Sequence, residues 1–364
     1  MLLFYFFIAV ILVNTAYFIL FSKFSMSVPT VVDSRELYPV SVIICAKNEA
    51  ENLKKNVPFI LSQEYPNFEV ILINDASIDD TQEVIEAFAR ENEKVHTVTI
   101  ENNETFWSNK KYSLTLGIKR AVNHRLVFTD ADCQPASNQW LRLMVGHFSE
   151  EKQLVLGYGA YYKEKGVLNS LIRFETLLTA LQYFSYAKVG MPYMGVGRNL
   201  AYSSNLFYDN RGFMSHMQIA SGDDDLFVNE VATPTNTAIC FAEESFTYST
   251  PKTTFSAWIR QKKRHITTAK YYKSNHKTLL GLYFISNLLF WLFVIPTFIF
   301  IDWKIPLSLI IFRFSLQYIF MGKGAKLLKE NDLLPYIPLL ELFLVFIQLT
   351  IFISNSLSKP KRWK

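Results

Sequence analysis

The sequence lacks the glycine-rich loops that mark two large classes of nucleotide-binding enzyme. Neither GxxxxGKS nor GxGxxG occurs in its 364 residues, so a P-loop and a dinucleotide-binding fingerprint are both excluded. Its three cysteines, Cys45, Cys133 and Cys240, have no metal-ligand spacing. We interpret them as small buried side chains in a reducing compartment.

Charged residues are also scarce, at 19%, whereas 50% of the chain is hydrophobic and 15% is aromatic. The apolar residues are concentrated in a few runs. Two of these, 1–21 and 279–301, are long enough to cross about 30 Å of bilayer as helices. Two further runs near the C-terminus are weaker candidates, because they contain Arg313 and Glu341.

The first run is expected to remain as an uncleaved anchor, because no basic segment precedes it and no clear small-residue cleavage site follows it. Lys23 and the basic stretch 252–277 flank the large region between the apolar runs. The positive-inside tendency therefore predicts that this region is cytoplasmic. If every C-terminal run spans the membrane, the basic tail lies outside, so one run is a candidate for a re-entrant or interfacial helix.

The predicted organisation is an integral membrane protein with one large globular domain. The sequence is divided into an N-terminal transmembrane anchor (1–21), a linker (22–38), the domain (39–278), two or three C-terminal membrane segments (279–357) and a basic tail (358–364). The domain is long enough to have its own hydrophobic core.

Within the domain, short apolar runs alternate with helical patterns. The β-branched runs predict strands, and the amphipathic patterns between them predict helices. The predicted strands are 39–46, 68–74, 95–100 and 125–129, and the predicted helices are 48–61, 81–92 and 110–122. This alternation predicts an α/β fold with a mostly parallel, wound sheet. Ligands of such sheets bind outside the carboxyl ends of the strands.

Carboxylates collect at those predicted strand ends. Asp75 follows the second strand, and Asp130 and Asp132 follow the fourth. Asp79 and Asp80 are expected to cap the next helix, whereas Asp75 comes too early to cap and is predicted to contact a ligand. A purely structural sheet has no reason to end strand after strand in carboxylates, so we predict a functional site at this edge.

Asp130 and Asp132 form a DxD sequence. Their two carboxylates can bind one hard cation, Mg²⁺ or Mn²⁺, and leave coordination positions for phosphate oxygens. Such a cation would offset the charge that grows on a departing nucleoside diphosphate. A solvated turn is the alternative interpretation of the same triplet.

A second acidic cluster lies at 222–226, GDDDL. Three adjacent carboxylates raise one another's pKa unless a cation or another partner intervenes. One of them, held near a substrate hydroxyl, would act as a general base, and a solvated acidic turn is the alternative. Downstream, QKKRH at 261–265 could clamp a pyrophosphate or lie on anionic lipid as a juxtamembrane helix.

In their order along the chain, PVSVIICAKNEAENL, NDASIDDT, TDADC, GVGRNLAYS, SGDDDL and QKKRH resemble glycosyltransferase family 2, the inverting class with a GT-A fold. The resemblance covers about residues 39–265, and several motifs in one order are far more specific than any single motif. It implies a GT-A catalytic domain, which is Rossmann-like, between N- and C-terminal transmembrane helices.

The resemblance also implies residue roles. Residues expected to bind the donor are Ala46, Glu49, Asp75, Lys110, Lys111, Asp130, Gln261 and Arg264. The metal would be held by Asp132 and Asp130, and the acceptor side would include Gly197, Asn199 and Asp225. Asp224 is the narrowly favoured general base when the motif is read from Gly222, and Asp223 is the base when it is read backward from Leu226.

Two positions depart from the family pattern. Asn109 stands where the family has a glycine before Lys110 or Lys111, and the sequence leaves open which lysine matches. His265 stands where the QxxRW box has tryptophan. The second departure weakens the case for a processive polysaccharide synthase.

The resulting prediction is a membrane-anchored glycosyltransferase that moves a sugar from a nucleotide-diphosphate sugar to a hydroxyl acceptor, with Mg²⁺ or Mn²⁺ as cofactor. A lipid or lipid-linked glycan at the membrane is the expected acceptor, and no nucleic-acid partner is expected. A nucleotidyltransferase with a related sheet remains an alternative, as does a non-enzymatic membrane scaffold or transporter component.

Overall fold

The computed structural model describes residues 1–29, 37–101, 110–219 and 221–357. The chain forms two compact units. The sheet unit comprises Pro29–Tyr162 and Gly190–Pro251, and the helical unit comprises Met1–Val28, Lys163–Val189 and Lys252–Lys361. The predicted basic tail, much of the predicted linker and Asn109 lie outside the described residues.

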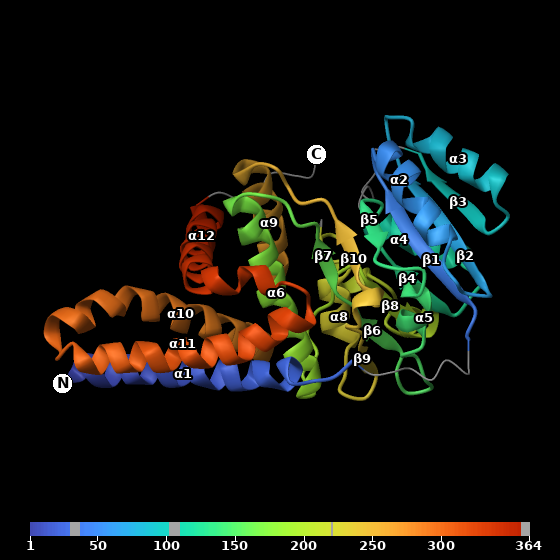
Figure 1. The fold of residues 1–364 in the computed structure, drawn as a ribbon. Helices are drawn as coiled ribbons and strands as arrows, with labels where there is room; N and C mark the ends of the chain where they lie inside the picture. The colour runs from blue at the N-terminus through green and yellow to red at the C-terminus, as the bar shows by residue number, and fades with distance from the viewer. Residues whose placement is uncertain (30–36, 102–109, 220, 358–364) are drawn as a thin grey trace. The chain divides into compact units, whose positions relative to one another are not determined.

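The sheet unit contains a seven-stranded sheet in the order β3-β2-β1-β4-β8-β6-β9 (Figure 1). Its strands are β1 (Val40–Ala46), β2 (Phe68–Asp75), β3 (Val95–Ile100), β4 (Arg125–Phe128), β6 (Leu154–Leu156), β8 (Leu200–Ser203) and β9 (Thr237–Ile239). Strands β3, β2, β1 and β4 are parallel, whereas β8 is antiparallel to both of its neighbours. The mostly parallel wound sheet predicted from the sequence is therefore confirmed.

A smaller sheet and several helices complete this unit. The smaller sheet has the order β5-β10-β7, formed by β5 (Cys133–Pro135), β10 (Thr247–Ser249) and β7 (Gly159–Tyr161). The helices are α2 (Ala50–Leu61), α3 (Thr81–Glu91), α4 (Lys110–Arg120), α5 (Trp140–Val145), α7 (Ser204–Asp209) and α8 (Asp225–Val231), with short 3₁₀ turns η1 (Met214–His216) and η2 (Glu243–Ser245). Helix α2 begins later than predicted because Asn48 has a left-handed φ of 57°.

Helices pack on both faces of the central strands, which explains why those strands read as continuous apolar runs. On one face, Val42 and Leu72 belong to a core that includes Leu53 of α2 and residues of α5. On the other face, α4 approaches so closely that a Cβ at Gly117 would lie 2.3 Å from the side chain of Ile73. The close approach holds α4 against the sheet and its first residue, Lys110, near the strand ends.

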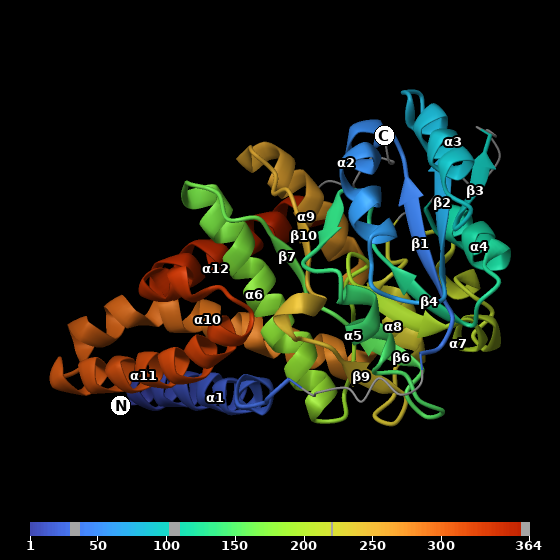
Figure 2. The same cartoon turned by 45° about the vertical axis from the view of Figure 1, so that its right-hand side comes forward.

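The helical unit contains the apolar helices. Its elements are α1 (Leu2–Ser25), α6 (Val167–Lys188), α9 (Phe255–Ala269), α10 (Ser274–Phe300), α11 (Lys304–Leu327), η3 (Asn331–Tyr336) and α12 (Ile337–Leu357). Helix α1 packs along α10 and α11 (Figures 1 and 2). Four segments are long and apolar enough to cross a membrane: Leu2–Ser25, Ser274–Phe300, Lys304–Leu327 and Asn331–Asn355. These properties indicate membrane association.

The two charges that weakened the C-terminal candidates pair with each other. The side chain of Arg313 on α11 is fully buried, and its Nη2 donates to both carboxylate oxygens of Glu341 on α12 at 2.9 Å. Asn14 of α1 and Asn287 of α10 accept further hydrogen bonds from Arg313. The pairing explains how both apolar helices accommodate a charged residue.

Two parts of the predicted 39–278 domain pack in the helical unit instead of the sheet unit. They are Lys163–Val189, which contains α6, and the part of Lys252–Lys361 that contains α9. Helix α6 contacts α1, where Phe184 stacks on Phe24 with ring centroids 4.8 Å apart. The assignment of residues 39–278 to one functional domain remains a prediction, because the packing does not show whether these segments act together in catalysis.

Candidate active site

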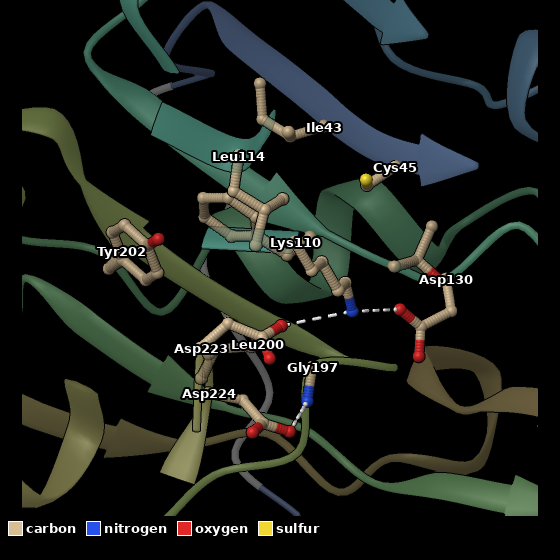
Figure 3. Close-up of a pocket in the computed structure, with 12 residues that line it drawn as sticks. Ile43, Cys45, Lys110, Leu114, Asp130, Gly197, Leu200, Tyr202, Asp223 and Asp224 are labelled. Carbon is tan, nitrogen blue, oxygen red and sulfur yellow. Dashed lines mark hydrogen bonds and ion pairs between the residues drawn. The ribbon is translucent and has the colours of Figure 1, made fainter. Parts of the chain in front are cut away.

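The site lies at the carboxyl edge of the large sheet. Parallel pairing sets Ala46 opposite Asn74 and Ile43 opposite Phe128, so β1, β2 and β4 end at the same edge. A pocket there is lined by residues of β1, β4 and β8, of α4 and of the 222–226 segment (Figure 3). The structure thus brings the first and second predicted acidic clusters together.

Lys110 bridges these two clusters (Figure 3). Its Nζ lies 2.7 Å from Oδ1 of Asp130 and 3.1 Å from Oδ2 of Asp223. Burial alone would lower the pKa of Lys110, but the two carboxylates raise this pKa well above its ordinary value. The ammonium group therefore stays charged between the DxD sequence and the GDDDL segment.

Lys111, the other lysine that matched the family pattern, points elsewhere. Its buried Nζ donates to the carbonyl oxygens of His216 at 2.7 Å and Ile219 at 2.9 Å. Burial lowers the pKa of Lys111 to about 8, although the nearby carboxylate of Asp223 partly opposes this shift. The geometry therefore favours Lys110 as the lysine that faces a donor, and Lys111 as an anchor for the segment before the GDDDL cluster.

Asp223 and Asp224 are adjacent but lie in opposite electrostatic environments. Burial, together with the charges of Asp223 and Asp225, raises the pKa of Asp224 to about 7. For Asp223, burial also favours the protonated form, but the Lys110 ammonium outweighs it and lowers the pKa below its ordinary value. Opposite shifts of this kind are typical of carboxylates with different catalytic roles.

The side chain of Asp224 is held by two backbone N–H groups. Gly197 N donates to Oδ2 at 2.7 Å, and Asp225 N donates to Oδ1 at 2.7 Å. Asp224 is also the N-cap of α8, and Oδ1 of Asp225 accepts from Leu226 N at 2.8 Å. The loop before β8 and the start of α8 thus fix the orientation of the Asp224 carboxylate.

Asp75 lies buried at the end of β2, and its predicted contact with a ligand remains a prediction. Its Oδ1 accepts from Ser113 Oγ at 2.5 Å, and its Oδ2 lies 3.7 Å from Nζ of Lys47. Ala46 is the last residue of β1, and Glu49 is the N-cap of α2. Their predicted contacts with a nucleotide remain predictions.

Of the two aspartates predicted to cap the helix after β2, Asp79 makes the side-chain hydrogen bonds and Asp80 makes no side-chain capping bond. Oδ1 of Asp79 accepts from the backbone N and the hydroxyl of Thr81, and Oδ2 accepts from Ala50 N at 3.3 Å. Asp80 is the N-cap residue of α3 but makes no side-chain capping hydrogen bond. Asp79 therefore supports the starts of both α2 and α3, which explains the position of this acidic pair without a catalytic role.

The DxD sequence offers a donor set that suits a hard divalent cation. Oxygen atoms of Asp130 and Asp132 and the sulfur of Cys133 all lie within 4.8 Å of one another. Burial raises the pKa of the Cys133 thiol well above its ordinary value, which favours the neutral thiol. The two carboxylates remain as oxygen ligands, and oxygen ligands are those that Mg²⁺ and Mn²⁺ prefer.

The predicted acceptor segment contains one residue with a clear internal role. The side chain of Asn199 is fully buried, and its Nδ2 donates to the carbonyl oxygens of Tyr158 and Ser245 at 2.9 and 2.8 Å. Its Oδ1 accepts from Nε1 of Trp140 at 3.0 Å. These bonds hold the start of β8 in the core, and the acceptor roles of Asn199, Gly197 and Asp225 remain predictions.

The predicted pyrophosphate clamp lies on α9, in the helical unit. Two lysines between Gln261 and Arg264 are engaged within that unit, since Lys262 Nζ lies 2.6 Å from Glu175 Oε2 and Lys263 Nζ lies 2.6 Å from Ser354 Oγ. These contacts attach α9 to α6 and α12. The roles of Gln261 and Arg264 in donor binding remain predictions.

The sequence analysis gave Arg198 no role of its own, although GVGRNLAYS contains it and the predicted acceptor-side residues Gly197 and Asn199 flank it. Arg198 follows Gly197 and lies close enough to Asp130 and Asp132 to interact with both charges. The signal available in the sequence was a single charged residue in a motif whose other residues are uncharged. Lys47 and Ser113, the partners of Asp75, were likewise not assigned a contact with it.

Comparisons with known proteins agree with this geometry. The family model described as glycosyl transferase family 2 matches residues 41–207, and the one described as glycosyl transferase family group 2 matches 126–322. The chain is similar to glycosyltransferase AglE of Haloferax volcanii, with 27% identity over 192 residues that cover 50% of this chain and 58% of that protein.

It is also similar to an Escherichia coli protein named UDP-Glc:alpha-D-GlcNAc-diphosphoundecaprenol beta-1,3-glucosyltransferase WfaP, with 29% identity over 35% of this chain and 47% of that protein. A poly-beta-1,6-N-acetyl-D-glucosamine synthase of Staphylococcus epidermidis is 33% identical over 32% of this chain and 27% of its own length. The matches thus span from about a quarter to somewhat over half of these relatives.

Among solved structures, the mannosyltransferase PcManGT from Pyrobaculum calidifontis, in complex with GDP-Man and Mn²⁺, has a TM-score of 0.60. The alignment covers 93% of this chain and 99% of that one at 16% identity. At this identity the likeness establishes the fold, and it extends over nearly the whole chain. The predicted GT-A-type architecture is confirmed.

Proposed function

The chain belongs to glycosyl transferase family 2, and from this membership we propose that it transfers a sugar from a nucleotide-diphosphate sugar to an acceptor hydroxyl. The observation that carries the proposal is the Lys110 bridge between Asp130 and Asp223, with Asp224 beside it. One pocket therefore contains candidate groups for donor binding and for proton removal.

The donor nucleotide would bind over the ends of β1 and β2, near Ala46, Glu49 and Asp75. Asp130 and Asp132 would hold Mg²⁺ or Mn²⁺, which supplies Lewis-acid stabilisation of the leaving diphosphate when bound. Lys110 would contribute a fixed positive charge to the same region. The Mn²⁺ in the PcManGT complex supports the choice of metals.

Asp224 would act as the general base in a single displacement. Its carboxylate takes the proton from the acceptor hydroxyl while the hydroxyl oxygen forms a bond to the anomeric carbon. The bond from that carbon to the diphosphate oxygen breaks, and the bonding electrons leave with the nucleoside diphosphate. One displacement inverts the anomeric configuration. A pKa of about 7 suits proton removal near neutral pH.

The acceptor would be a lipid or a lipid-linked glycan, because the chain has four candidate membrane spans. The name of WfaP describes a diphosphoundecaprenol-linked acceptor, which supports the same class. We place the sheet unit on the cytoplasmic side, since Lys23 and the basic stretch 252–277 flank it. Nucleotide sugars are then supplied from the cytoplasm.

The test is to incubate the purified full chain, in lipid nanodiscs, with a panel of nucleotide sugars, Mn²⁺ and polyprenyl-diphosphate-linked sugars, whose sugar carries the acceptor hydroxyl. Release of one nucleoside diphosphate with formation of a glycosylated lipid is expected. Asp209→Asn, at an exposed position at the end of α7, is the matched control and should retain activity. Release of pyrophosphate would instead indicate a nucleotidyltransferase, and absence of any product across the panel would contradict the proposal.

A further inference from the structure

Arg198 is a cation whose protein partners are neutral. Its Nη1 donates to the carbonyl oxygen of Ala160 at 3.0 Å and to Oγ of Ser249 at 2.8 Å. Its guanidinium carbon lies 4.2 Å from the ring centroid of Tyr161. These contacts orient the guanidinium group, and none of them is with a carboxylate.

The rest of the guanidinium remains available to a ligand. Arginine has five N–H donors, and the two described bonds both come from Nη1. Within the described ranges, no carboxylate forms an ion pair with Arg198, although Asp132 and Asp130 lie near enough to interact with its charge. A partly buried cation without an ionic partner is costly unless an anion reaches it.

The backbone and surroundings hold Arg198 in place before any ligand arrives. Its carbonyl oxygen accepts from Oγ1 of Thr129 at 3.0 Å and from Oγ1 of Thr247 at 2.9 Å. Gly159 lies against its side chain, where an added Cβ would be 3.0 Å from Cβ and 3.3 Å from Nε of Arg198. The absence of a side chain at Gly159 thus leaves the space that the arginine occupies. Such preorganisation reduces the entropy lost on binding.

We infer that Arg198 binds a phosphate group of a substrate through the Nε and Nη2 edge of its guanidinium. The planar fork of arginine matches two phosphate oxygens. The inference rests on the proposed function, because it is the reaction that would bring a phosphorylated substrate to this pocket. Two sources have the same chemistry, the diphosphate of the donor and the phosphate of a lipid-linked acceptor.

The location fits both sources. Arg198 is near the DxD carboxylates, which would hold the metal and the donor diphosphate. It also follows Gly197 directly, and the N–H of Gly197 binds the candidate base Asp224. An acceptor phosphate bound here would therefore lie on the side of the pocket where the acceptor hydroxyl is needed.

The test measures binding, not turnover, with the full chain in detergent and Mg²⁺ by calorimetry. The probes are the nucleoside diphosphate that the wild type binds most tightly, farnesyl phosphate, and their unphosphorylated counterparts. Arg198→Gln should weaken binding of the phosphorylated donor probe, the lipid probe or both by about tenfold or more. If affinity falls for the nucleoside diphosphate alone, the donor diphosphate is the group that Arg198 binds. If it falls for farnesyl phosphate alone, that group is the phosphate of the lipid-linked acceptor. Arg120→Gln, exposed at the end of α4, is the matched control.

Equal affinity of the folded Arg198→Gln variant and the wild type for both phosphorylated probes would overturn the inference. Equal weakening of phosphorylated and unphosphorylated probes would also overturn it, because that result indicates a structural role. If Arg198→Gln does not fold, Arg198→Lys is used in its place. This variant should lose affinity about three- to tenfold for the phosphorylated probes only, because the lysine ammonium cannot bind two phosphate oxygens as the planar guanidinium does. Unchanged affinity in Arg198→Lys would again overturn the inference.

The failure of this inference can be distinguished from failure of the proposed function. A wild type that binds phosphate through Arg198 but consumes no nucleotide sugar would contradict only the glycosyltransferase proposal. A wild type that transfers sugar while Arg198→Gln binds every phosphorylated probe normally would contradict only the assignment of Arg198.

Discussion

The residues at the centre of the pocket are three carboxylates and one lysine with unequal environments. Lys110 binds Asp130 and Asp223 directly, whereas the carboxylate of Asp224 accepts hydrogen bonds from two backbone N–H groups. Asp223 therefore stays ionised as a partner of Lys110, and Asp224 can exchange a proton near neutral pH. This difference favours Asp224 as the base.

We expect Asp224→Asn to lower the rate of sugar transfer by roughly 10²–10⁴-fold, the usual contribution of general-base catalysis. The amide cannot take the acceptor's proton, and its single oxygen retains only one of the two accepted backbone hydrogen bonds. Donor binding should change little. Single-turnover transfer and donor titration measure the two effects, with thermal unfolding as a check on folding.

Asp223→Asn and Asp225→Asn are the comparison for this substitution and should be milder. If Asp223→Asn is the inactive variant, the motif is correctly read backward from Leu226. Retention of activity by all three variants would show that the cluster is a solvated turn.

The pH dependence of transfer follows from the raised pKa of Asp224. A general base must be ionised, so the single-turnover rate should fall about tenfold per pH unit below a midpoint near 7 and level off above it. Asp223→Asn removes a nearby negative charge and leaves Asp130 as the remaining carboxylate against Lys110, so it should move the midpoint to lower pH. A wild-type midpoint near the ordinary value of 3.8 would contradict the assignment.

The metal site gives a further prediction for single residues. Asp132→Ala should weaken Mn²⁺-dependent donor binding by at least about tenfold, or about 1.4 kcal/mol, because one carboxylate alone leaves the diphosphate charge poorly compensated. Cys133→Ala is a matched neighbour whose neutral thiol should contribute nothing, so this variant should bind as the wild type does. Calorimetry with donor and Mn²⁺ measures both, and unchanged affinity in Asp132→Ala would remove this residue from the site.

At the scale of elements, the first turn of α4 connects two parts of the site. Lys110 holds the DxD sequence and Asp223, while Lys111 holds the segment around His216 through backbone carbonyl oxygens. The close packing of α4 at Gly117 keeps this turn in place. The start of one helix thereby supports both the donor side and the base side of the pocket.

The buried charge pair of Arg313 and Glu341 joins two of the apolar helices, α11 and α12. Arg313→Ala or Glu341→Ala alone should lower the free energy of unfolding by about 3–5 kcal/mol, because each leaves an uncompensated buried charge. Replacing both residues by leucine should lower the free energy of unfolding by much less than the sum of the two single losses, because no buried charge is left. Thermal unfolding in one detergent compares the three variants, and losses that simply add would show that the two side chains do not stabilise each other.

At the scale of the whole molecule, the chain alternates between its two units. The sheet unit is interrupted by residues 163–189, which pack in the helical unit, and the chain then returns to it before α9. Fold similarity to PcManGT extends over 93% of the chain. This coverage indicates that helices outside the sheet are part of the shared architecture.

The proposed membrane topology can be tested on intact cells. Protease added outside should leave the sheet unit uncut, and the same protease should cut it in inverted vesicles, because the flanking basic residues favour the cytoplasm. Immunoblotting with an antibody to this unit measures both results. Cleavage in intact cells would overturn the cytoplasmic placement of the sheet unit and the proposal that nucleotide sugar reaches it from the cytoplasm.

The sequence by itself determined the alternating strands and helices and the carboxylates at the strand ends. Hydrophobic periodicity and β-branched content are local properties, so β1, β2, β3 and β4 were predictable within one or two residues. The small strands β6 and β9 are three residues each, too short for a periodic pattern to reveal them.

Only the tertiary structure decided which charges meet. Lys110 and Lys111 are neighbours with equal side chains, yet one reaches two carboxylates and the other reaches backbone carbonyl oxygens. Arg313 and Glu341 each weakened a predicted membrane span, until their pairing explained both. Charge interactions and desolvation depend on distances through space and on burial, and neither can be read from order along the chain.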